Sequence, residues 1–167
     1  MERVLLAVDG MKASRRALCF AVDLCKSLKV NLSVLQVIDY RRYREYLRKL
    51  QDGSARVRRL FEGSMMAATF AEAGEHEVAR QLITLARKNA DELLSEFDGT
   101  GVKFSLEVKS GQPVREVVSY VNQHRNVVVT IYDVNDEDNG QTNRALVKQV
   151  FKTITERISG PLVVMHA

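Results

Sequence analysis

Residues 3–38 read RVLLAVDGMKASRRALCFAVDLCKSLKVNLSVLQVI and contain two apolar runs on either side of a segment with helical periodicity. The first run, residues 3–8, is continuous and too short for a helix, as is typical of a parallel strand buried on both faces. Residues 31–38 form the second run. Between the runs, from residue 12 to residue 29, apolar residues recur at helical spacing and are expected to face inward: Leu18, Ala21, Val22, Cys25 and Leu28. The stretch therefore predicts a strand–helix–strand unit.

Helix and strand patterns continue to alternate in the second half of the chain. A long amphipathic helix is expected at residues 75–97, followed by a strand of alternating polar and apolar residues at 103–109 and a helix that starts at the proline at 113. An apolar strand at 126–132, a helix at 144–158 and a final apolar strand at 161–166 complete the chain. This order predicts an α/β three-layer sandwich with a five-stranded, mostly parallel sheet, formed by one domain of residues 1–167. The alternating strand and the final strand are expected at the edges of the sheet.

The composition is that of an ordinary globular domain, with 46% hydrophobic residues among 167. The formal charge of +4 is concentrated in residues 39–62, which hold eight basic and four acidic residues, and the rest is neutral. No apolar stretch approaches the roughly 18–20 residues of a spanning helix, so no membrane contact is expected. The N-terminus lacks the pattern of a secretion signal, which favours a cytoplasmic protein. Cys19 and Cys25 lack metal-binding spacing, and we expect both to be core-facing or half-buried.

Ligands of parallel sheets bind beyond the carboxyl ends of the strands, where the strand order reverses. Asp9 ends the first strand and could accept hydrogen bonds from a ribose or an adenine, although turn chemistry alone also accounts for an Asp-Gly pair. An adenosine-like pocket at these strand ends would include Asp9, Gly10, Val37, Ile38, Asp39, Gly111 and Asp133. No histidine has a Ser, Cys or carboxylate at a catalytic spacing, so the sequence predicts no catalytic residues.

Short motifs along most of the chain outside residues 40–74 follow the order and spacing of a known family. They are VDG at residues 8–10, SRRAL at 14–18, SGQP at 110–113, NVVVTIYD at 126–133 and GPLVVMH at 160–166. In these motifs the chain resembles the universal stress protein family. The resemblance implies an adenine nucleotide alpha hydrolase-like fold, a homodimer and a role in stress or growth arrest.

The loop after the fourth predicted strand departs from the family pattern. Nucleotide-binding members hold phosphates on a Gly-x-x-Gly loop and on a later Gly-Ser or Gly-Thr pair. Here residues 132–140, YDVNDEDNG, contain one glycine and four carboxylates, and Lys148-Gln149 stands near the later pair. A phosphate cradle needs glycine backbone, and each carboxylate would repel a triphosphate by about 1 kcal/mol.

Two conclusions follow from this loop. A Mg²⁺ ion could reverse the repulsion, but the carboxylate spacing does not match an EF-hand loop, so we predict no metal site. We expect a member that does not bind ATP through the usual loop and needs no cofactor, although the pocket at Asp9 could still accommodate ATP or AMP.

Residues 39–74 form a basic insertion that is longer than a compact crossover requires and carries the pattern of short helices. Its arginines alternate with tyrosines and could bind a partner: Arg41, Arg42, Arg44, Arg48, Arg58 and Arg59. An acidic protein or another anionic ligand is favoured over nucleic acid as that partner. Alternatively, the insertion is a solvated helix whose Tyr/Leu stripe packs on its own domain or on a second subunit.

These observations together predict a non-catalytic stress-response or regulatory homodimer. The final strand is apolar on both faces and would pair antiparallel with its copy through Leu162, Val163, Val164 and Met165. Two alternatives remain open. One is an adenine-nucleotide-binding protein, or weak ATPase, that uses Asp9 and a remodelled loop, and the other is a module that docks an anionic partner through the basic insertion.

Overall fold

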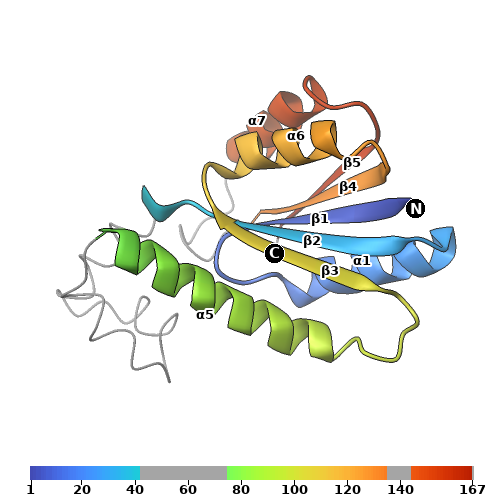
Figure 1. The fold of residues 1–167 in the computed structure, drawn as a ribbon. Coiled ribbons are helices and arrows are strands. Elements are labelled where there is room, and N and C mark those ends of the chain that lie inside the picture. The colour runs from blue at the N-terminus through green and yellow to red at the C-terminus, as the bar shows by residue number, and fades with distance from the viewer. Residues whose placement is uncertain (42–74, 135–143, 167) are drawn as a thin grey trace.

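The computed structural model describes residues 1–41, 75–134 and 144–166. Strands and helices alternate along these residues (Figure 1). In chain order they are β1 (Arg3–Asp9), α1 (Arg15–Leu28), β2 (Asn31–Ile38), α5 (Glu75–Ser95), β3 (Phe104–Ser110), α6 (Pro113–Gln123), β4 (Val127–Val134), α7 (Arg144–Thr155) and β5 (Leu162–His166). None of the helices in these ranges is long and apolar enough to cross a membrane.

The five strands form one sheet in the order β3-β2-β1-β4-β5. All four neighbouring pairs are parallel, which confirms the predicted α/β sandwich and extends it from a mostly parallel to a fully parallel sheet. α1 and α5 cover one face of the sheet, and α6 and α7 cover the other (Figure 1). The alternating strand β3 and the apolar strand β5 form the two edges, as the sequence predicted.

The central strand β1 supplies the core on both sides of the sheet. Val4, Leu6 and Val8 pack with α1, whereas Leu5 and Ala7 pack with α6 and α7. All five side chains are buried, because a central parallel strand between two helical layers has no solvated face. The continuous apolar run at residues 3–8 is the direct consequence of this position.

The helices begin at caps that the sequence supplies. The Ser14 side chain accepts a hydrogen bond from the Ala17 N–H, and Gln112 plays the same part for α6 by accepting from the Arg115 N–H. Pro113 lies at the first turn of α6, as predicted.

Several predicted details differ from the structure. Leu28 was expected on the inner face of α1 but is 46% exposed, because it lies on a flank of the helix, four positions from Leu24 and eight from Phe20. Cys25 is buried, but Cys19 is exposed rather than core-facing. The predicted helices at residues 75–97 and 144–158 end earlier, with turns completing each segment.

Candidate functional site

β1 and β4 lie side by side where the strand order reverses, and their carboxyl ends border the crevice in which folds of this kind bind ligands (Figure 1). The strand register pairs Val8 with Asp133 and Asp9 with Val134. Because side chains alternate between the faces of a strand, the Asp9 carboxylate lies on the α6/α7 side and that of Asp133 on the α1 side. The two predicted acids are therefore near each other in the sheet but face opposite layers.

Asp9 is engaged inside the fold. Only 7% of its surface is exposed, and its Oδ2 accepts a hydrogen bond of 3.1 Å from the Tyr132 hydroxyl. Tyr132 is itself buried among the residues of the α6/α7 layer. A ribose or adenine that bound Asp9 would have to share its carboxylate with this hydroxyl.

Asp133 is a strand residue, although the sequence placed it in the loop after the fourth strand. β4 continues to Val134, two residues farther than predicted, so Asp133 is held by the sheet and is 1% exposed. Its Oδ2 accepts a hydrogen bond of 2.8 Å from the backbone N–H of Ser14, the N-cap of α1. A carboxylate is favourable at the positive end of a helix, so Asp133 anchors the β1–α1 loop against β4.

The β1–α1 loop is also held from β2. The Gly10 N–H donates to the Val37 carbonyl over 3.2 Å, and the Gly10 carbonyl accepts a bond of 2.7 Å from Gln36 Nε2. Val37 and Ile38 are fully buried. Gln36 was missed from the sequence, although an amide near the end of the apolar run NLSVLQVI was a signal of a buried hydrogen bond.

Asp39 and Gly111 lie apart from this buried group and line an open groove of about 950 Å³ beside α6 and α7. The Gly111 N–H donates to the Ile38 carbonyl over 3.1 Å, which joins the ends of β2 and β3. Gly111 has a φ of 155°, which residues with a side chain rarely adopt, and a Cβ there would lie 2.9 Å from Cγ of the Glu116 side chain, which would have to shift. The seven predicted pocket residues are thus divided between a buried crevice and a groove.

Other predicted sites fall partly outside the described residues. Of the six arginines proposed to bind a partner, only Arg41 is described, and it lines the same groove. The acidic positions 136–138 and most of the basic insertion lie outside the described ranges. Within those ranges there is no group of three or more His, Cys, Asp or Glu side chains that could hold a metal ion.

The model of the universal stress protein family matches residues 1–166. The chain belongs to the universal stress protein family. The match covers nearly the whole chain and confirms the family that the sequence motifs indicated.

Several solved structures have the same fold as this chain. One is the hypothetical protein MJ0577, with a TM-score of 0.59, 17% identity and coverage of 99% of this chain and 96% of that chain. Another is the universal stress protein UspA from Lactobacillus plantarum, with a TM-score of 0.57, 13% identity and 99% coverage of both chains. A third is a universal stress protein in complex with cAMP, with a TM-score of 0.50, 11% identity and coverage of 99% and 97%. A search of curated proteins gives no match.

The β5 edge of this universal stress protein has the residues that were predicted to form a dimer. Leu162, Val163, Val164 and Met165 are each partly exposed, although none carries a charge. Val163 and Met165 pack toward α1, and Leu162 and Val164 pack toward α6 and α7. The edge therefore presents apolar side chains on both faces of the sheet.

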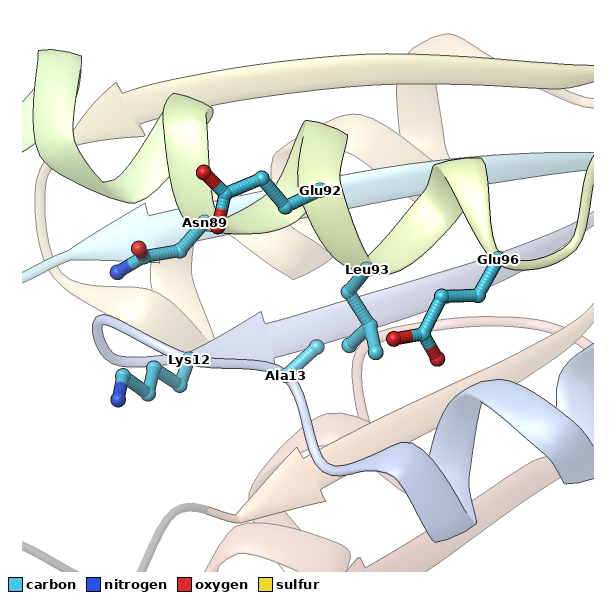
Figure 2. A pocket seen from close by; sticks show the side chains of 6 residues that line it. All are labelled: Lys12, Ala13, Asn89, Glu92, Leu93 and Glu96. Atoms are coloured by element: carbon cyan, nitrogen blue, oxygen red, sulfur yellow. The ribbon is translucent and has the colours of Figure 1, made fainter.

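A smaller pocket separates the β1–α1 loop from α5 (Figure 2). It has a volume of about 290 Å³ and is lined by Lys12, Ala13, Asn89, Glu92, Leu93 and Glu96. Glu96, which directly follows α5, forms an exposed ion pair with Arg15 of α1 beside this pocket. Its lining is mixed in charge.

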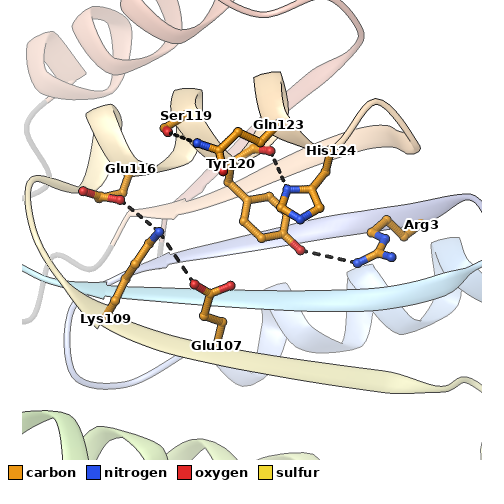
Figure 3. A network of polar contacts seen from close by, with 8 residues as sticks. All are labelled: Arg3, Glu107, Lys109, Glu116, Ser119, Tyr120, Gln123 and His124. Carbon is orange, nitrogen blue, oxygen red and sulfur yellow. Dashed lines mark hydrogen bonds and ion pairs between the residues drawn. The ribbon is translucent and has the colours of Figure 1, made fainter.

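Polar side chains from α6, β1 and β3 meet on the α6 side of the sheet (Figure 3). Arg3 donates to the Ser33 hydroxyl over 3.1 Å and to the Tyr120 hydroxyl over 3.5 Å, and the Tyr120 ring stacks on His124 with 4.0 Å between centroids. Lys109 forms ion pairs with Glu116 over 3.0 Å and with Glu107 over 3.7 Å. The hydrogen bond that the Lys109 ammonium donates to the Glu116 carboxylate is the largest cause that raises the pKa of Lys109 above its usual value.

Proposed function

We propose that this universal stress protein acts in the cytoplasm as a non-catalytic regulatory homodimer paired through β5, and that it does not hold a triphosphate on the loop after β4. The observation that carries the proposal is the edge strand β5, whose first four side chains are uncharged, partly exposed and apolar on both faces. An edge of this kind is open to pairing with another strand. Antiparallel pairing with the same strand of a second copy is the simplest symmetric arrangement.

The helices on both sides of β5 support this interface. On α1, Phe20 and Leu28 are exposed by 40% and 46% and are spaced four positions on either side of Leu24. Leu24 lies nine positions from Arg15, or about 180° around the helix, and Arg15 pairs with Glu96 just beyond α5, so this apolar flank lies on the side of α1 away from α5, toward β4 and β5.

α7 has a corresponding apolar flank. Phe151 is 46% exposed, and Thr153 of the same helix lines the groove beside α6. Two positions along an α-helix are separated by about 200°, so Phe151 lies on the flank of α7 away from that groove. That flank is on the side of β5, because α7 packs on β5 as well as on α6.

A double substitution tests the dimer without entering the core. Phe20→Glu with Phe151→Glu should convert a dimer into a monomer in analytical ultracentrifugation, because both side chains are exposed in one subunit and would be covered in two. The matched control is Asn122→Glu, an exposed position on α6, which should leave the sedimentation coefficient unchanged. Dimers that persist in the double variant, with circular dichroism unchanged, would contradict pairing at this edge.

The non-catalytic part of the proposal is supported by the state of the nucleophiles and acids. Burial raises the pKa of Cys25 to about 11, which keeps this thiol protonated and unreactive at neutral pH. Both cysteines are free, as is usual in a reducing compartment. The Asp9 and Asp133 carboxylates are engaged with Tyr132 and with the α1 N-cap rather than exposed in a reactive pair.

Binding of an adenine nucleotide at Asp9 is a second candidate function. It is favoured by the position of Asp9 at the end of β1, beside the reversal of strand order, and by a similar stress protein whose structure is a complex with cAMP. Calorimetry with ATP and AMP, each with and without Mg²⁺, separates the two functions. Micromolar ATP binding that Asp9→Asn abolishes would contradict the proposal that the protein acts without holding a triphosphate and would favour nucleotide binding at Asp9. The absence of detectable heat would support the first proposal.

A further inference from the structure

Three arginines from three separate elements line the groove beside α6 and α7. Arg41 follows β2, Arg115 lies in the first turn of α6, and Arg157 follows α7. The groove measures about 950 Å³, which lies at the upper end of the range for small-molecule sites. Neither Asp9 nor Asp133 lines it, so it is separate from the crevice between β1 and β4.

The positive charge of these arginines is not neutralised within residues 1–41, 75–134 and 144–166. In these ranges none of the three guanidinium groups has a hydrogen bond or an ion pair. The two acids that line the groove have other partners: Glu116 pairs with Lys109, and Asp39 Oδ1 accepts the backbone N–H of Arg41 over 3.0 Å. Three guanidinium groups therefore remain available to an external anion.

The other lining residues favour a polar ligand. Ser110, Gln112 and Thr153 offer hydroxyl or amide groups, and the apolar surfaces among the described lining residues are the Val114 side chain and the Tyr40 ring, which also carries a hydroxyl. Gln112 already caps α6 by accepting the Arg115 N–H, so recognition of an anion here would depend on side chains more than on the helix end. Guanidinium groups bind phosphate oxygens through two parallel hydrogen bonds, which a lysine cannot do.

We propose that this groove binds a small molecule carrying two or more phosphate groups. A single phosphate can satisfy one or two guanidinium forks, whereas three arginines on separate elements match a ligand with several anionic groups. Such a ligand would bridge the end of β2 to both helices of the α6/α7 layer. The site would work alongside the dimer and does not depend on nucleotide binding at Asp9.

Isothermal titration calorimetry at low salt with sodium tripolyphosphate tests the site, because this probe contains no adenosine. We expect saturable binding that is weakened about tenfold or more in Arg115→Gln/Arg157→Gln. The matched control is Arg125→Gln, which removes an exposed arginine at the other end of α6 and should change the affinity less than about twofold. Asp39→Asn keeps a side chain that can cap the backbone and removes a negative charge, so it should strengthen binding.

Inorganic orthophosphate, which carries a single phosphate group, is the second probe and should bind more weakly than tripolyphosphate. Equal affinity for the two probes would overturn the assignment to a multiply phosphorylated ligand. Absence of saturable tripolyphosphate binding in the wild-type protein, or an equal loss in Arg125→Gln, would overturn the site itself. Each single arginine variant is measured as well, with circular dichroism to confirm folding, so that failure of the double variant to fold does not decide the result.

Discussion

The two edges of the sheet differ in how they meet solvent. β3 alternates along its length, with Ser105 and Glu107 exposed on one face and Val108 buried beneath α5 on the other. β5 has only five residues, and its first four are uncharged, apolar and partly exposed on both faces. Charged side chains protect an edge strand from pairing with another chain. The comparison therefore identifies β3 as a solvated edge and β5 as an edge that a second subunit can cover.

The largest effect should come from blocking the outward hydrogen bonds of β5. The Pro161 carbonyl accepts from Thr130 of β4, so odd-numbered residues of β5 bond inward and the Val164 N–H points away from the sheet. Val164→Pro should leave the β4–β5 ladder intact and raise the dimer dissociation constant about 100-fold or more. Size-exclusion chromatography over a dilution series measures the change.

Leu106→Pro is the matched substitution on the other edge. The Leu32 N–H bonds to the Lys103 carbonyl, so the Leu106 N–H also points outward, from β3. Both proline variants lose some packing of a partly buried side chain, but only Val164→Pro should change the mass. If Leu106→Pro dissociated the dimer to the same extent, the contrast between the two edges would be lost.

Truncation of one valine on each edge should have a smaller effect. Val108→Ala removes buried surface and should lower the free energy of unfolding by about 1.5 kcal/mol, with the dissociation constant unchanged. Val163→Ala should destabilise the protein more at high than at low concentration, because the stabilisation that a dimer interface adds is lost from the wild type on dilution. Thermal melts at two protein concentrations distinguish these outcomes, and concentration-independent melting of the wild type would count against the dimer.

The smallest effect concerns the charges that protect β3. Glu116 and Glu107 raise the pKa of Lys109, so the stabilisation that they provide is complete below about pH 10.5 and disappears as the pH rises through the folded-state pKa. The side chain is 34% exposed, so Lys109→Gln should cost only about 0.5 kcal/mol at pH 7. Urea unfolding of both proteins should show this difference shrinking above pH 10.5, and a difference that grew there would refute the ion-pair account.

Local patterns were sufficient to predict the layers and the edges of the sheet. The continuous run in β1 and the alternation in β3 follow directly from burial on two faces and on one face. The start of α6 at Pro113 likewise depends on its own sequence neighbourhood. Such features need no knowledge of distant residues.

The missed details all depend on contacts between distant segments. Asp133 belongs to β4 because pairing with β1 extends the strand, and its partner Ser14 is 119 positions away. The Gly10–Gln36 bond and the groove with Arg157 likewise arise only when separate elements meet. Leu28 looked inward on a helical wheel, but which flank of a helix is covered depends on its neighbours in the sheet.

Sedimentation equilibrium of the unmodified chain at micromolar concentration tests the central claim most directly. Pairing through β5 predicts a mass near 37.8 kDa, twice the 18.9 kDa of one chain. A mass of 18.9 kDa that persists as the protein concentration rises would contradict the account of the β5 edge.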